Sequence, residues 1–155
     1  MPDYSETIFR LIEYEIWCNH RALDFLSSLS DDECHRDFGF GLRTPHRTIF
    51  HIADVMQGWS RSVAPIIEVP SWLEYRAGLP LSEIRELMAN AGTYLLAAAK
   101  SSHAMGLLSL ERRVNHVFHL VTHGTHHRGQ LLSMVTLMDL GQPFEGGDFG
   151  GWSGM

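Results

Sequence analysis

Apolar side chains recur at helical spacing along four long parts of this 155-residue chain, and this pattern restricts its fold more than any other feature. The four segments cover about residues 5–29, 44–65, 82–100 and 109–140. In the first of them, Ile8, Ile12 and Ile16 fall on one face while charged residues fall largely elsewhere. No alternating pattern typical of a strand competes with these helices. Four long helices with short connections predict an all-α protein, organised as a four-helix bundle.

The ends of these helices carry local signals. Ser5 is expected to be the N-cap of the first helix, and Thr44-Pro45 supplies an N-cap followed by a proline at the first helical position. Residues 30–33, Ser-Asp-Asp-Glu, are expected to cap a short turn. The third helix is expected to start at Ser82, and Gly141 is expected to end the fourth in a left-handed conformation.

Length and charge limit the class of protein. The length of the chain is typical of a single domain. We expect a bundle domain over residues 1–141 followed by a glycine-rich tail over residues 142–155. The net charge of −6 argues against a dedicated nucleic-acid-binding protein, which should carry a basic patch. No apolar run approaches the ~18 residues of a membrane span. Nucleic acid and membrane are therefore not expected partners.

The two cysteines, Cys18 and Cys34, are too few for a disulfide-rich secreted scaffold. Cys18 lies in an apolar helical segment, which predicts a buried core thiol. The acidic N-terminus has no apolar segment typical of a signal peptide. These features together predict a cytoplasmic protein.

Histidine is the most distinctive residue of the chain. Five of the ten histidines lie between His116 and His127. His123 and His127 are four residues apart on a predicted helix, so their Cβ atoms should lie ~5–6 Å apart on one face. Two imidazoles in that arrangement can converge on one metal ion. A pair at this spacing is also compatible with a purely structural role, but five histidines in twelve residues favour metal binding.

A catalytic metal usually has three protein ligands and an open position. His51, in the middle of the second helix, is the best candidate for the third ligand. Asp54, one turn later, is either a hydrogen-bond partner of a ligand or an exposed carboxylate.

The remaining histidines are expected to play other roles. His119 continues the stripe of His123 and His127, but the outer pair would lie ~12 Å apart along the axis, so all three cannot easily bind one ion. His119 is therefore expected to be a neighbour, a substrate contact or a core histidine. His126 should face solvent or another helix. His116, like His119, is expected to be a neighbour of the site with an undecided role. Four further histidines, which have no partner at ligand spacing, are expected on the surface: His20, His35, His46 and His103.

Two motifs resemble those of a known family. They are Thr44-Pro-x-x-Thr-Ile-Phe-His51-Ile with Trp59, and His119-Leu-Val-Thr-His123-Gly-Thr-His126-His127-Arg128-Gly129-Gln130. Together with Tyr14, Trp17 and Asn19 in the first helix, they resemble the DinB/YfiT-like metal-binding four-helix bundles. The second motif is specific, whereas the other matches are loose. The resemblance covers nearly the whole chain.

The resemblance implies an up-down-down-up bundle, usually a homodimer, with a divalent metal such as zinc or nickel held by three histidines. Carried over by position, these are His51, His123 and His127, which agrees with the choice made from helical geometry. Better-understood relatives are thiol-dependent transferases and isomerases. The segment between the last two helices is short here, over residues 101–108, so the site should be more open than in relatives.

Three neutral histidines leave the charge of a divalent ion uncompensated, and such an ion lowers the pKa of a bound water or thiol. The first hypothesis is a metal-dependent enzyme that activates a low-molecular-weight thiol for S-transfer to a small-molecule substrate. A second is a hydrolase that uses a metal-bound hydroxide, for which Asp54, Glu13 or His119 would be weak candidates as general base. A third is a non-catalytic metal-binding protein in which a fourth protein ligand, such as His119, completes the coordination of the metal.

Overall fold

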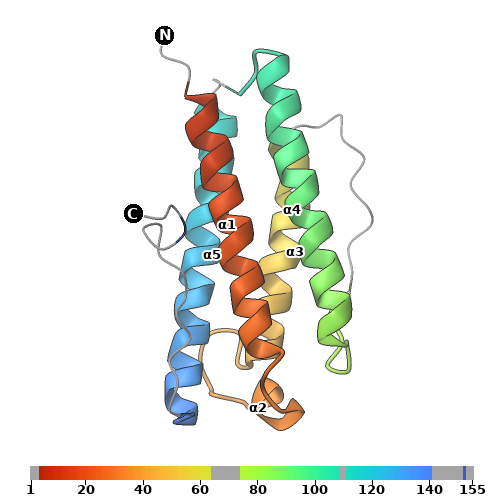
Figure 1. The fold of residues 1–155 in the computed structure, drawn as a ribbon, viewed down its shortest axis with the longest axis vertical. Coiled ribbons are helices and arrows are strands. Elements are labelled where there is room, and N and C mark those ends of the chain that lie inside the picture. The colour runs from red at the N-terminus through yellow and green to blue at the C-terminus, as the bar shows by residue number, and fades with distance from the viewer. Residues whose placement is uncertain (1–3, 64–73, 109–110, 141–151, 153–155) are drawn as a thin grey trace.

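The computed structural model describes residues 4–63, 74–108, 111–140 and 152 of the chain, and it is all-helical in these parts. Its elements are α1 (Ser5–Leu26), α2 (Asp31–His35), α3 (Pro45–Val63), α4 (Leu81–Ala104) and α5 (Glu111–Met138). The four long helices lie side by side, and the short helix α2 lies at one end (Figure 1). α1 and α5 run in one direction along the long axis, and α3 and α4 run in the other.

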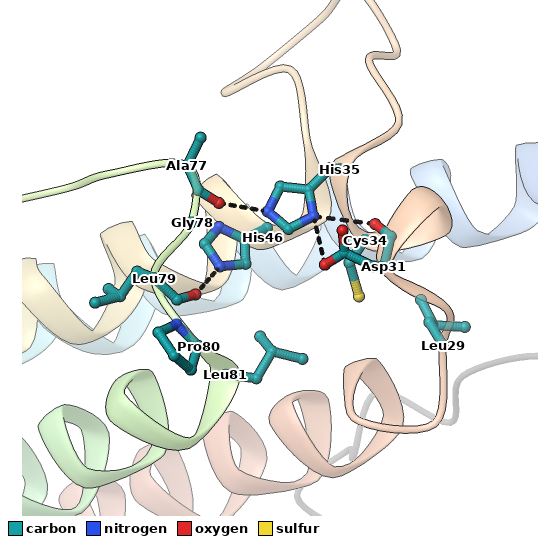
Figure 2. Close-up of a pocket in the computed structure, with 10 residues that line it drawn as sticks. All are labelled: Leu29, Asp31, Cys34, His35, His46, Ala77, Gly78, Leu79, Pro80 and Leu81. Atoms are coloured by element: carbon teal, nitrogen blue, oxygen red, sulfur yellow. Dashed lines mark hydrogen bonds and ion pairs between the residues drawn. The ribbon is translucent and has the colours of Figure 1, made fainter.

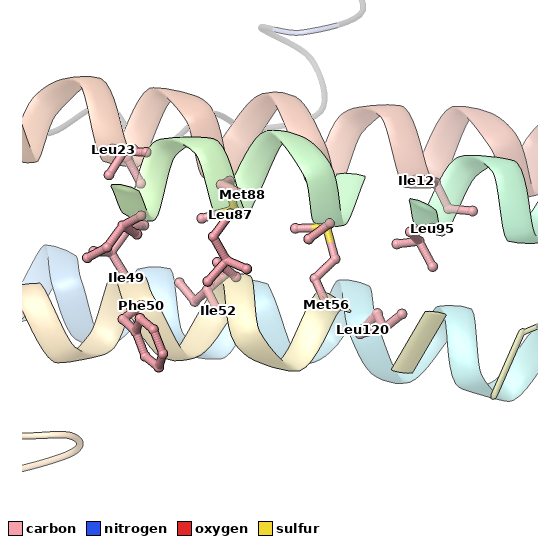
Figure 3. Packing of buried hydrophobic residues seen from close by; sticks show 14 of the residues in the cluster. Ile12, Leu23, Ile49, Phe50, Ile52, Met56, Leu87, Met88, Leu95 and Leu120 are labelled. Carbon is pink, nitrogen blue, oxygen red and sulfur yellow. The ribbon is translucent and has the colours of Figure 1, made fainter. Parts of the chain in front are cut away.

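The core is built from the apolar faces of all four long helices. α3 packs against α4 and α5, and α1 packs against the same two helices. Figure 3 shows how side chains from different helices meet at one level, for example Ile12 of α1 beside Leu95 of α4. Met56 of α3 and Leu120 of α5 are 2% and 3% exposed, so the core continues to the helix that carries most of the histidines.

Two of the expected caps are present. The Ser30 Oγ accepts from the Glu33 backbone N–H at 3.3 Å, and the Glu33 carboxylate accepts from the Ser30 N–H at 2.7 Å, which completes a capping box for α2. The Thr44 Oγ1 accepts from the Arg47 N–H at 3.1 Å, and Pro45 is the first residue of α3. The entry to the helix that carries His51 is therefore fixed by local sequence.

Other helix ends differ from expectation. Ser5 is the first helical residue and not the N-cap, because Tyr4 occupies the cap position, and α4 begins at Leu81 rather than at Ser82. α1 ends at Leu26 rather than at residue 29. The hydroxyl groups of Ser27 and Ser28 donate to the carbonyl oxygens of Leu23 and Phe25, and this satisfies backbone acceptors at the helix end.

At the far end of α5, Asp139 has a φ of +56°. It is therefore the left-handed residue that follows the helix, a role that aspartate tolerates better than most residues. Gly141, which was expected in this role, lies outside the described residues. The glycine-rich tail also lies outside them except for Trp152, whose ring lies 6.0 Å from that of Tyr14, with the Arg10 guanidinium 5.5 Å from its centre.

No helix in the described part of the chain is long and apolar enough to cross a membrane. Both cysteines are buried and neither forms a disulfide in the structure, so the expectation of a buried core thiol at Cys18 is confirmed.

Candidate metal centre

Three histidines from two helices come together on one side of the bundle. His51 is on α3, whereas His123 and His127 are on α5. Their ring centres lie 5.0 Å apart for His51 and His123, 4.8 Å for His51 and His127, and 4.4 Å for His123 and His127. One nitrogen from each ring lies within 4.8 Å of the other two. Helical spacing identified His123 and His127, and the position of His51 in the second helix together with the family resemblance identified the third residue. The fold brings all three into reach of one ion.

The electrostatics of this cluster favour neutral imidazoles, which are the form that binds metal. The pKa of His123 is lowered to about 4, first by burial and then by His127 and His51 beside it. Burial also lowers the pKa of His51, and so do the neighbouring His127 and Arg47. His127 is 9% exposed, and burial lowers its pKa as well. All three side chains thus keep a free lone pair near neutral pH, as metal ligands require.

Gln130 holds the ring of His127. The Gln130 Oε1 lies 2.8 Å from His127 Nδ1, and an amide oxygen can only accept, so His127 donates from this nitrogen. His127 Nε2 is then the nitrogen that keeps a lone pair for a metal ion. The sequence motif contained Gln130, but its contact with His127 was not predicted. The signal was the three-residue spacing, which places the two side chains together on a helix.

His119 lies beside the cluster but outside it. Its ring centre lies 5.6 Å from that of His123 and 4.6 Å from that of Trp59 on α3, and its side chain is exposed. Trp59 also contacts His116, with ring centres 5.1 Å apart. These three rings form an aromatic row next to the candidate ligands.

Asp54 is half-buried on α3, and burial raises its pKa. Among the described contacts, it makes no hydrogen bond to the three histidines. The group that orients a ligand in this structure is Gln130. His126 is exposed, as expected, and lies beside the Gln130 amide at 3.1 Å.

Four histidines were expected on the surface, and this expectation is wrong for His46. It is 1% exposed, and its Nε2 donates to the Leu79 carbonyl at 2.7 Å while its Nδ1 lies 3.2 Å from the Tyr75 hydroxyl. Both nitrogens are paired, which removes the cost of burying an imidazole. His103 is exposed, and His20 and His35 are half-buried.

Figure 2 shows the pocket of about 360 Å³ that His46 lines with His35 and Cys34. The two imidazoles stack with ring centres 4.3 Å apart. The nitrogens of His35 face the carbonyl oxygens of Asp31 and Ala77 at 3.0 and 2.7 Å. This pocket is separate from the three-histidine cluster, and the ring nitrogens at its wall already have partners.

The fold and the cluster define an all-helical protein with a three-histidine site that could bind a metal ion. The sequence model of the DinB family matches residues 1–148, so the chain belongs to the DinB family, which is metal-binding. No curated protein matches the chain.

Proposed function

We propose that this chain is a metal-dependent enzyme in which His51, His123 and His127 hold a divalent metal ion. The ion would activate a low-molecular-weight thiol for S-transfer to a small-molecule electrophile. The donor set supports this proposal, because three imidazoles suit zinc or nickel, the two ions that we expect. A bound ion of this kind would supply Lewis acidity, which lowers the pKa of a coordinated thiol.

The observation that carries the proposal is the number of ligands. Among the residues that the structure describes, the cluster contains three histidines, and the neighbouring His119 of α5 lies against Trp59 instead. A site with three protein ligands has a position left for an exchangeable group, which is typical of catalytic rather than structural zinc. In the transfer, the thiol would lose its proton to solvent and its sulfur would form the new bond to the electrophilic carbon. The bond between that carbon and its leaving group would break, and the leaving group would depart with the electron pair and take up a proton from solvent.

Hydrolysis is the second candidate function. It requires a general base beside the site, and Asp54 is one turn from His51 on α3. Because burial raises the pKa of Asp54, this carboxyl is better suited to proton transfer near neutral pH than an exposed carboxylate. No described hydrogen bond or ion pair joins Asp54 to the three histidines, so thiol transfer is the function we favour.

Cobalt-substituted protein tests the two functions. Titration with cysteine or glutathione should produce a sulfur-to-cobalt charge-transfer band, and the S-methylated thiols should not produce it. The variant His119→Ala should keep the band, since His119 is not among the proposed ligands. If no thiol changes the spectrum, thiol activation is wrong. Turnover of activated esters that is lost in His123→Ala would then support hydrolysis, and the absence of both activities would support a non-catalytic metal-binding protein.

We also propose that the chain works as a homodimer with the up-down-down-up topology of a four-helix bundle. Between Val114 and Met138 of α5, Arg128 is the one residue of the Lys, Arg, Asp and Glu types, and it is buried. The exposed face of this helix therefore has no formal charge, and Phe118 and Leu137 are 50% and 61% exposed on it. Two such faces can meet without charge repulsion. Sedimentation should show a dimer that Phe118→Glu converts to a monomer.

We propose that residues 1–141 form the functional domain. We also propose that the protein is cytoplasmic. The two buried cysteines form no disulfide in the structure, which suits a reducing compartment.

A further inference from the structure

We propose that the loop over residues 37–43 is a positioning element for the metal site. Through Gly41 and Gln130, the loop fixes which ring nitrogen of His127 is available to a metal ion. This inference rests on the proposed role of His127 as a ligand, but its first step concerns the metal-free protein. Neither Gln130 nor the loop touches a substrate in this account, so both act through His127.

The first step is the hydrogen bond between the amide and the imidazole. A neutral imidazole carries one proton, on either Nδ1 or Nε2. With the Gln130 oxygen 2.8 Å from Nδ1, the proton must be on Nδ1, and the lone pair is on Nε2. The Gln130 Nε2 is 3.1 Å from His126 Nε2, to which it donates, so both ends of the amide have a partner in this orientation.

The opposite orientation of the amide would reverse this outcome. It would turn the NH₂ group toward His127 Nδ1, which would then have to accept, and the proton would move to Nε2. A protonated Nε2 cannot bind a metal ion. The orientation of one amide group therefore determines whether His127 can complete the three-histidine cluster.

The second step is the contact that holds the amide in place. Gly41 packs directly on the Gln130 side chain. A Cβ atom at position 41 would come within 2.9 Å of both Cδ and Oε1 and within 3.1 Å of Nε2. The loop is thus in contact with the whole amide group, and a side chain at position 41 would have to displace that group.

The third step is the rigidity of the loop itself. The Phe38 N–H donates to the Arg43 carbonyl at 2.8 Å, and the Arg43 N–H donates to the Phe40 carbonyl at 2.9 Å. The Asp37 carboxylate accepts from the Gly39 N–H at 2.8 Å and from two nitrogens of the Arg43 side chain. These bonds close the loop on itself, so it can support Gln130 as a fixed surface.

The chain offers a matched pair of variants for the test. Gly39 and Gly41 both have a positive φ, of +74° and +55°, so alanine at either position meets the same kind of backbone strain. A Cβ at Gly39 has no heavy atom within 4 Å, whereas a Cβ at Gly41 meets Gln130. Gly39→Ala therefore controls for strain, and Gly41→Ala adds the displacement of the amide.

The experiment measures the tautomer of His127 by ¹⁵N NMR in the metal-free protein, and Co²⁺ affinity by competition with a chelator. We expect the wild type and Gly39→Ala to hold one tautomer, with the proton on Nδ1. Gly41→Ala and Gln130→Leu should populate both tautomers and bind Co²⁺ about 10- to 100-fold more weakly. Gln130→Glu, whose carboxylate can accept the same hydrogen bond, should restore both the single tautomer and the affinity.

Two results would overturn the inference. One is a single Nδ1-protonated tautomer in both Gly41→Ala and Gln130→Leu. The other is a mixture of tautomers in these variants with unchanged Co²⁺ affinity. A wild type that binds no Co²⁺ would instead contradict the proposed metal site, and the tautomer measurement would still report on the loop.

Discussion

Arg128 and Glu15 form a buried ion pair across the interface of α1 and α5, with 2.9 Å between Nη1 and Oε1 and side chains 6% and 2% exposed. Arg128 also donates to Asn19 Oδ1 at 2.5 Å and to Thr125 Oγ1 at 3.2 Å. Because Arg128 directly follows His127, α5 presents its candidate ligands toward α3 and its buried charge toward α1. Contacts with α1 on one face and with α3 on another therefore restrain the rotation of α5 about its own axis.

Removing one partner of this pair should be costly. Arg128→Met removes the charged partner of the buried Glu15 carboxyl, for which the Asn19 amide at 2.9 Å is then the remaining described donor, and it also removes the donor to Asn19 Oδ1. We expect a loss of about 3–5 kcal/mol in the free energy of unfolding, measured with urea. The double variant Glu15→Leu, Arg128→Met removes both charges and should cost much less than the sum of the two single variants. Strictly additive losses would contradict a coupled pair.

Gly124 should tolerate no side chain. A Cβ at this position would lie 1.7 Å from Glu15 Oε1 and 2.6 Å from its Cδ, and Glu15 cannot move away without breaking its bond to Arg128. We expect Gly124→Ala to lower the free energy of unfolding by about 1–3 kcal/mol, as overpacking does.

Gly129→Ala on the same helix is the control for this substitution. No heavy atom lies within 4 Å of a Cβ there, so the higher helix propensity of alanine should stabilise the protein by up to about 1 kcal/mol. Equal effects of the two substitutions would show that α5 and α1 do not pack as described.

His46 should make stability sensitive to acid. Burial lowers its pKa below the ordinary value, so below that value the unfolded chain binds a proton that the folded chain does not. Stability from the neutral imidazole is therefore present near neutral pH and is lost as the pH falls below about 6.5.

The measurement is the free energy of unfolding of metal-free protein as a function of pH. The substitution His46→Gln should reduce the slope on the acid side, whatever its effect near neutral pH. His20→Gln, at a half-buried histidine, provides the acid slope with which that of His46→Gln is compared. An unchanged acid slope in His46→Gln would show that His46 does not carry this sensitivity.

Helical periodicity predicted the long helices of this chain because their apolar faces repeat over many turns. The same spacing rule selected His123 and His127, since four residues on a helix bring two side chains to one face. His51 was selected by its position in the middle of the second helix and by the family resemblance. The ends of helices were predicted less well. At Ser27 and Asp139, the result depends on hydrogen bonds and backbone angles of single residues rather than on a repeated pattern.

Contacts between segments that are distant along the chain could not be predicted from the sequence. His46 has the same residue type as exposed His103, and its burial depends on carbonyl and hydroxyl groups about thirty residues later in the chain. The contact of Gly41 with Gln130 and the pairing of Glu15 with Arg128 likewise join segments that no local spacing connects. These contacts determine how the candidate ligands are held.

The central claim is that His51, His123 and His127 together hold one metal ion. Its most direct test is elemental analysis of protein purified without a histidine tag, beside the His127→Ala and His119→Ala variants. We predict one equivalent of a divalent metal, Zn or Ni, in the wild type and in His119→Ala, and none in His127→Ala. A wild type without metal, or a His127→Ala variant that retains the full equivalent, would contradict it.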